Sequence, residues 1–285
     1  MGAIDYWCNA FTPDRRALWD ASIAGQGVPL KIHREGDGFA EPAELVARMD
    51  ELGFDTLVLP TCDLADHAGE LDFESMATRP EEFAKWADTA PGRFVAAWSF
   101  DPASGMAGVR RAAEVTGDER YVGLHTHTHS FDRRFDHRDY YPFYALASDL
   151  GLPVVMQAGS SGGLMASECG RPIGIDRPAM YFPDVKFVLS HTGWPWVDEA
   201  LAMAIKHANV FLGTATYPPR HWSAELLRFA AGPGRGKTLL GTGFPVVGHR
   251  HLLRQLDEVE LSSEAREQLQ GGAARSVFAR IAGPR

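Results

Sequence analysis

The chain has 285 residues, of which 45% are hydrophobic and 23% are charged, as in an ordinary globular protein. Its formal net charge of -9 at pH 7 argues against nucleic acid or an anionic membrane surface as a partner, because both require a basic face. The expected partner is therefore a small molecule with a carbonyl or carboxylate group, and a homodimer is left open.

The N-terminal residues, the apolar runs and the cysteines indicate in which cellular compartment the protein is expected. The N-terminal residues lack a basic region followed by an apolar core, and no apolar run approaches the roughly 18 residues of a membrane span. Three cysteines, Cys8, Cys62 and Cys169, cannot form a disulfide framework, and their spacing matches no zinc knuckle. These features predict a cytoplasmic protein that does not bind membranes.

Eight short, apolar, β-rich runs recur along the chain. The predicted strands are Ala3–Trp7, Asp55–Pro60, Arg93–Ser99, Tyr121–His127, Pro153–Gln157, Val185–Ser190, Asn209–Gly213 and Lys237–Gly241. Apolar spacing of three and four predicts helices at Pro42–Leu52, Pro80–Asp88, Gly105–Val115, Tyr140–Leu150, Trp196–His207 and Ala224–Ala231. This alternation predicts an α/β fold of parallel strands, and eight repeats favour a closed (β/α)8 TIM barrel over an open doubly wound sheet.

The length fits one barrel, so residues 1–285 are expected to form a single domain. The stretch 9–40, rich in glycine, is too long for a simple connection after the first strand. It is interpreted as a lid over the barrel mouth, in which Phe11 and Trp19 could contact an aromatic substrate.

Functional groups of such barrels sit where the strands end at their carboxyl side. His191 ends an apolar strand and precedes a Gly-Trp-Pro turn. An imidazole there is a ready general base, because its ordinary pKa lies near neutrality. The alternative is a core histidine bonded to the backbone.

His125, His127 and His129 alternate with threonines, so on a strand all three would share one face. Two of them could then hold a zinc ion, with His191 as the third ligand. Substrate contact is favoured, because carboxylate and thiolate ligands are not evident at the right strand ends. Further substrate contacts are expected at other strand ends and in the loops that follow them: Trp7, Asn9, Gln157, Trp194 and Arg171.

Taken together, several motifs resemble one family. They are Ile4-Asp5 in the first strand, Phe187 to Trp196 around His191, Asn209-Val-Phe-Leu, Leu240-Gly-Thr-Gly-Phe-Pro, and Ala273-Ala-Arg-Ser-Val-Phe. They look like the amidohydrolase-related family that includes aminocarboxymuconate-semialdehyde and resorcylate decarboxylases. The resemblance runs from about residue 3 to 280 and implies a distorted TIM barrel.

The resemblance also exposes departures at the family's metal-binding positions. Where the family has Asp-x-His-x-His, this chain has Asp5-Tyr-Trp7-Cys-Asn9. The strand-five histidine corresponds to Gln157 and the strand-eight aspartate to Gly243, so only His191 survives. No metal or other cofactor is therefore expected, with zinc as the alternative.

Residues 157–163 and the segment through His191 to Trp196 resemble a subgroup of hydroxyphenyl-β-ketoacyl-CoA hydrolases. The leading hypothesis is a metal-independent hydrolase that acts on a small carbonyl substrate, in a retro-Claisen cleavage. His191 would be the base, while His125 and His127 polarise the carbonyl. The alternatives are a non-oxidative decarboxylase or other lyase, and a catalytically inactive binding protein.

Overall fold

Eight parallel strands follow one another around a barrel, in a computed structural model that describes residues 2–9, 13, 40–61, 78–161 and 165–281. The strands are β1 Ala3–Asp5, β2 Phe54–Thr61, β3 Phe94–Ser99, β4 Tyr121–Thr126, β5 Val154–Gln157, β6 Phe187–Ser190, β7 Val210–Gly213 and β8 Thr238–Leu239. Each pairs with its sequence neighbour, so the prediction of a TIM barrel is confirmed and the open doubly wound sheet, which reverses its strand order, is excluded.

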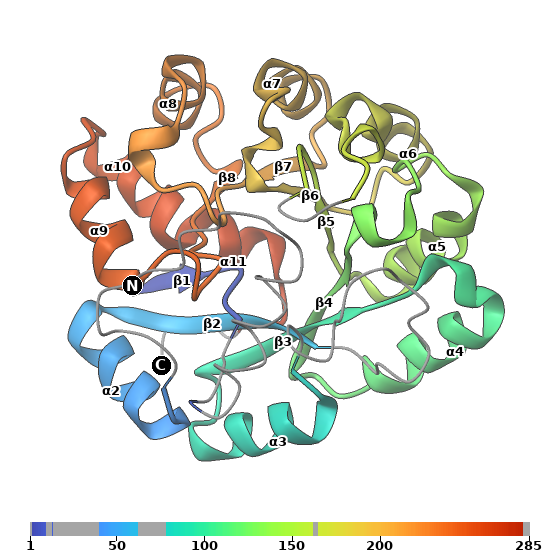
Figure 1. Cartoon of the computed structure of the whole chain (residues 1–285), viewed down its shortest axis with the longest axis horizontal. Helices are drawn as coiled ribbons and strands as arrows, with labels where there is room; N and C mark the ends of the chain where they lie inside the picture. Colours follow the sequence, from blue (N-terminus) through green and yellow to red (C-terminus); the bar gives the residue numbers. More distant parts are fainter. Residues whose placement is uncertain (1, 10–12, 14–39, 62–77, 162–164, 282–285) are drawn as a thin grey trace.

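An outer ring of helices surrounds the strands (Figure 1). The helices are α2 Pro42–Leu52, α3 Pro80–Thr89, α4 Gly105–Val115, α5 Tyr141–Leu150, α6 Asp176–Tyr181, α7 Val197–Lys206, α8 Ala224–Ala231, α9 His249–Asp257, α10 Ser263–Glu267 and α11 Ala273–Val277. Gly53 and Gly151 end α2 and α5 in the left-handed conformation, as expected for C-caps. Within the described residues, no helix has the length and apolar character that a membrane span requires.

The barrel interior is filled by branched side chains, as in other barrels of this class. All eight strands contribute to one buried cluster: Ile4, Val58, Val95, Val122, Val155, Val188, Phe211 and Leu239. Ala273, Ala274, Val277 and Phe278, from α11 and the residue after it, join the same cluster. Because Arg275 of α11 bonds the Gly2 carbonyl before β1, α11 covers the N-terminal end of the barrel and leaves the other end as the mouth.

The barrel closes between β1 and β8 through the residues that follow these two strands, and we call this region the seam. The Tyr6 N–H donates to the Leu240 carbonyl at 3.1 Å, the Gly243 N–H donates to the Trp7 carbonyl at 2.9 Å, and Cys8 pairs with Phe244. The Tyr6 ring lies inside the barrel against β7 and the residues after β8. A Cβ at Gly213 would lie 2.1 Å from the Tyr6 hydroxyl oxygen, and one at Gly241 would lie 2.4 Å from the Tyr6 ring, so glycine is required at both positions.

Two sequence-based expectations need correction. The fourth strand ends at Thr126, and His127 and His129 lie in a 3-10 turn at Thr128–Phe131 or just before it, so the three histidines do not share a strand face. The helices after β8 were missed, because no apolar spacing was recognised there. The predicted lid at 9–40 lies almost wholly outside the described residues.

Candidate active site at the barrel mouth

Four histidines meet at the carboxyl ends of β4 and β6. His125 lies on β4, His127 and His129 belong to the turn that follows it, and His191 comes directly after β6. The His127 and His129 rings are 5.8 Å apart. Burial lowers the pKa of His127 well below its usual value, and a proton on His129, His125 or His191 would lower it further.

His191 sits in a strained turn. His191, Thr192 and Gly193 have φ values of 61°, 58° and 74°, three consecutive residues in the left-handed region. For histidine and threonine this conformation costs about 1 to 3 kcal/mol each. Strain of this kind persists only where surrounding contacts enforce it, and it concentrates at functional sites.

The side chain of His191 is fixed by the end of β7. Its Nδ1 lies 3.0 Å from the Ala215 carbonyl oxygen and 3.1 Å from the Thr216 hydroxyl. Because a carbonyl oxygen only accepts, Nδ1 carries the proton and Nε2 is the proton-accepting nitrogen. Burial lowers the pKa of His191 to about 4, opposed by the Ala215 bond, so the ring is neutral at pH 7.

His127 has the opposite proton arrangement. The Ser130 N–H donates to its Nδ1 at 3.3 Å, and the Ser130 hydroxyl lies 2.6 Å from the same nitrogen. A backbone N–H only donates, so Nδ1 is the acceptor and Nε2 carries the proton. The mouth therefore holds one neutral imidazole that accepts a proton at Nε2 and one that donates there.

The other two imidazoles are held by neighbouring strand ends. His125 Nδ1 lies 2.7 Å from the Ser99 hydroxyl at the end of β3, and the His125 ring packs on Trp7 with ring centroids 4.2 Å apart. His129 Nε2 lies 2.9 Å from the Gly159 carbonyl oxygen. Burial lowers the pKa of His129, opposed by the Gly159 carbonyl and by the nearby Gln157 side chain. The structure thus brings Trp7 and Gln157 to the histidines.

Tyr6 links the two segments that hold His191. Its hydroxyl lies 2.6 Å from the Ser190 hydroxyl and accepts the Ala215 N–H at 3.3 Å, inside the barrel and fully buried. Ser190 precedes His191, and Ala215 is the residue whose carbonyl bonds the His191 ring. Burial raises the pKa of Tyr6 above its usual value, so the phenol stays neutral.

Three residues predicted to contact the substrate are either largely exposed or already bonded to other protein groups. The Asn9 amide donates to the Phe244 carbonyl at 2.9 Å. Trp194 is 51% exposed, with its ring 6.4 Å from that of Tyr217. Arg171 forms ion pairs with Glu199 and Glu168 and covers the Trp196 ring. A substrate role for these residues stays a prediction.

The positions at which the resemblance implies metal ligands do not fit a metal. Trp7 has no ligand atom, and the Asn9 amide hydrogen-bonds the backbone. Gly243 has no side chain, and a Cβ there would lie 2.4 Å from the Thr216 methyl group. Among the described residues, the one group of at least three histidine, cysteine or carboxylate side chains with all ligand atoms within 4.8 Å is Asp5, Cys8 and His249; His125, His127 and His191 form no such group.

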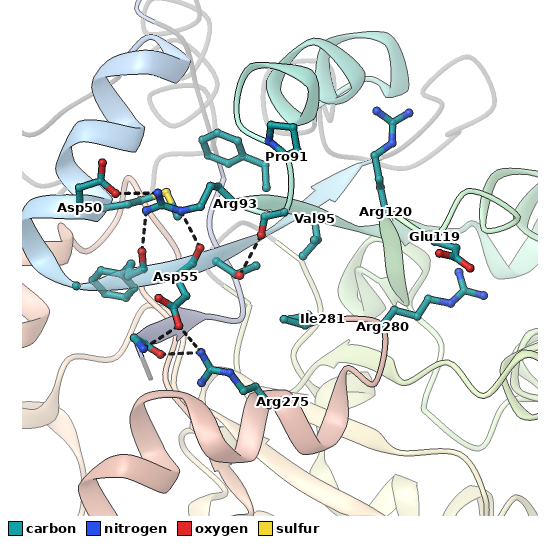
Figure 2. A pocket seen from close by; sticks show the side chains of 17 residues that line it. Asp50, Asp55, Pro91, Arg93, Val95, Glu119, Arg120, Arg275, Arg280 and Ile281 are labelled. Carbon is teal, nitrogen blue, oxygen red and sulfur yellow. Dashed lines mark hydrogen bonds and ion pairs between the residues drawn. The ribbon is translucent and has the colours of Figure 1, made fainter. Parts of the chain in front are cut away.

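A hollow of about 710 Å³ lies at the opposite, N-terminal end of the barrel (Figure 2). Its arginines have internal partners: Arg93 pairs with Asp50 at 2.7 Å, Arg275 pairs with Asp55 at 2.6 Å, and Arg280 donates to the Thr116 and Tyr121 carbonyls. These bonds tie strand starts to flanking segments, as expected for the rim that serves stability.

Sequence reasoning missed the residues that orient the histidines. Ser99, Ser130, Thr216 and Tyr6 are common residue types with no distinctive spacing, and their roles depend on neighbours up to 209 positions away. The one available signal was position, because Ser99 and Thr216 lie in the predicted strand ends.

Comparison with known proteins gives a consistent picture. The sequence profile of one family, described as amidohydrolase, matches residues 4–280. An uncharacterised TIM-barrel protein of Bordetella bronchiseptica is 21% identical, with 99% of both chains covered and a TM-score of 0.74. The 5-carboxyvanillate decarboxylase of Sphingomonas paucimobilis is 18% identical, with 98% of this chain and 99% of that chain covered and a TM-score of 0.66.

A third solved structure bears on cofactors. The dihydroxybenzoic acid decarboxylase of Polaromonas, with bound manganese and the inhibitor 2-nitroresorcinol, is 17% identical, with 99% of this chain and 98% of that chain covered and a TM-score of 0.69. The search of curated protein sequences found no match. Because that decarboxylase binds manganese, the expectation that this chain needs no metal is not confirmed.

Proposed function

Because this chain belongs to the amidohydrolase family, we propose that it is an enzyme that cleaves a carbon–carbon bond beside the carbonyl group of a small molecule by adding water. The observation that carries the proposal is the pair of neutral imidazoles with opposite proton positions, His191 and His127. One can accept a proton and the other can donate a hydrogen bond, as attack of water on a carbonyl requires.

The proposed reaction balances with water as the only co-substrate. His191 Nε2 takes a proton from water while the oxygen bonds to the carbonyl carbon, and the His127 Nε2–H stabilises the oxyanion. The carbonyl reforms as the adjacent carbon–carbon bond breaks, and the leaving carbanion takes the proton from His191. General-base catalysis supplies about 10² to 10⁴-fold, and oxyanion stabilisation adds a comparable factor.

The buried Trp7, whose ring packs at a tilt against His125, and the half-exposed Trp194 would contact the apolar part of the substrate. Gln157 would act through the neighbouring His129, whose pKa it raises. Arg171 would have to break its ion pairs with Glu199 and Glu168 to bind a substrate carboxylate, so we assign it the weakest contact.

The test is cleavage of aromatic β-diketones and aromatic β-ketoacyl thioesters in water enriched in ¹⁸O. We expect two products in equal amounts, with one labelled oxygen in the new carboxylic acid. A His137→Asn variant is the matched control, because His137 is 41% exposed in its side chain and outside the four-histidine group. Products without label would contradict the water-dependent step.

A second candidate is non-oxidative decarboxylation of a hydroxylated aromatic acid. The four buried imidazoles favour it. A substrate carboxylate beside them would raise their lowered pKa values, so that one ring could take up a proton and form an ion pair with the carboxylate. The named activities of the related barrels also support it. Release of carbon dioxide from dihydroxybenzoates or 5-carboxyvanillate, with no ¹⁸O in the aromatic product, would select this candidate.

Binding without turnover of either substrate set would indicate the third alternative, a catalytically inactive binding protein.

A further inference from the structure

Asp5, Cys8 and His249 converge where β1 meets the residues after β8. Asp5 ends β1, Cys8 follows three residues later, and His249 begins α9. Their ligand atoms all lie within 4.8 Å of one another, and Asp5 Oδ2 is 3.1 Å from His249 Nε2. The side chains of Asp5, Cys8 and His249 are 0%, 0% and 2% exposed, so water does not solvate them.

The carboxylate of Asp5 is held in one orientation. Its Oδ1 accepts the N–H groups of Trp7 and Thr242 at 3.1 and 3.0 Å, and its Oδ2 accepts the Thr242 hydroxyl. Bonds of this kind orient metal-binding carboxylates in proteins and are usually as necessary as the ligands themselves. Oδ2 keeps a second lone pair on the side of His249.

The imidazole of His249 is the second, independent observation. It is clamped between Phe54 and Phe244, with ring centroids at 5.0 and 5.4 Å. Within the described part of the chain, the buried His249 Nδ1 has no hydrogen-bond partner, and Nε2 lies 3.1 Å from the Asp5 carboxylate without hydrogen-bond geometry. An ion held between Nε2 and Oδ2 would give both of these atoms a partner.

We propose that Asp5, Cys8 and His249 bind one zinc ion at the seam of the barrel. A carboxylate, a thiolate and an imidazole are all zinc ligands, and the thiolate selects against magnesium and manganese. The two negative ligands neutralise a divalent cation, so the buried site carries no net charge.

The site is separate from the four histidines and does not depend on the proposed reaction. The zinc ion would have a structural role, because it would link β1 to the segment that leads from β8 into α9. In the described residues, β1 and β8 are otherwise joined here by a few separate hydrogen bonds and one bridge. Metals that bind only the native state stabilise it in proportion to their occupancy.

The test is metal analysis of the purified full chain, followed by replacement of its metal with Co²⁺. We expect about one equivalent of zinc per chain and, with cobalt, a near-ultraviolet thiolate-to-cobalt band. Cys8→Ser should abolish this band, and Cys169→Ser is the matched control, because Cys169 is equally buried but its Sγ faces the Ala166 carbonyl at 3.3 Å. His249→Ala should lower zinc content at least tenfold.

Three outcomes would overturn the proposal. They are less than a tenth of an equivalent of zinc after growth with added zinc, a cobalt spectrum without a thiolate band, or full zinc content in a folded Cys8→Ser variant. Loss of zinc in His127→Asn with retention in His249→Ala would place the metal at the mouth instead. Cobalt spectra of the wild-type protein decide the question even where a variant fails to fold.

Discussion

His191 owes its orientation to backbone atoms of another strand end rather than to a carboxylate. The Ala215 carbonyl fixes its proton on Nδ1, and the strained turn aims Nε2 away from that bond. The sequence predicted that this histidine ends a strand, because the apolar run before it is clear. It could not predict the tautomer, which depends on a residue 24 positions away.

Replacing His191 with asparagine should reduce kcat by about 10² to 10⁴-fold, because an amide cannot accept a proton near neutral pH. Folding should persist, since asparagine can still donate to the Ala215 carbonyl. Steady-state kinetics and a thermal melt measure the two effects. Intact kcat combined with a lower melting temperature would mean that His191 is a structural residue.

Tyr6→Phe removes the hydroxyl that joins Ser190 to Ala215 and leaves the buried Ala215 N–H unpaired. We expect a loss of about 1 to 3 kcal/mol of stability and a fall in kcat of about tenfold with KM little changed. Tyr144→Phe is the matched control, because its buried hydroxyl donates to the Phe135 carbonyl and not to a group that holds His191. Equal kinetic effects in both variants would exclude a positioning role for Tyr6.

At the scale of elements, the sequence located every strand to within a few residues, because eight apolar runs alternate with helical spacing. It placed the end of β4 at His127, one residue too far, and wrongly expected His125, His127 and His129 to share a strand face, because the Thr-His alternation resembles that of a strand. The 3-10 turn, in which the Ser130 N–H bonds His127, directs the imidazoles after β4 toward His191, which follows β6. Turn geometry of this kind has no periodic signature.

The turn between β6 and α7 offers a test at this scale. In Gly193→Ala, the new Cβ would lie 2.9 Å from that of Ala200 on α7, at a φ of 74°. Gly151→Ala has a similar φ of 64° but nothing within 4 Å, so it measures backbone strain alone. We expect about 1 to 2 kcal/mol for Gly151→Ala, with unchanged kinetics.

Gly193→Ala should cost more than Gly151→Ala in urea unfolding and should also lower kcat, because α7 or the His191 turn must shift. Equal losses of stability in the two variants, with equal kcat, would show that the His191 turn tolerates displacement and that its geometry does not govern the reaction.

For the whole molecule, the lowered histidine pKa values predict acid sensitivity. The native pKa of His191 is about 4, below its ordinary 6.5, so between these values the unfolded chain binds a proton that the native chain does not. Stability therefore falls as pH falls from about 6.5 to about 4, by about 1.4 kcal/mol per pH unit at most for this group, and the effect is complete below pH 4.

Urea unfolding at pH 7, 5.5 and 4.5 checks this prediction in wild type and in His191→Asn. The variant lacks the titrating ring, so its stability should decline less steeply across this window. Parallel decline in the two proteins would show that His191 is solvated and has an ordinary pKa in the native state.

The surroundings of Gly243 restrict which side chains this position can accept. The resemblance implies an aspartate at this position, but here the neighbouring Thr216 methyl group fills the space that any Cβ would need, and Thr216 itself has a φ of 64°. A single mutation to aspartate would therefore meet a clash before it could serve as a ligand. An aspartate at position 243 therefore requires a change at Thr216 as well, so the two positions can accept new side chains only together.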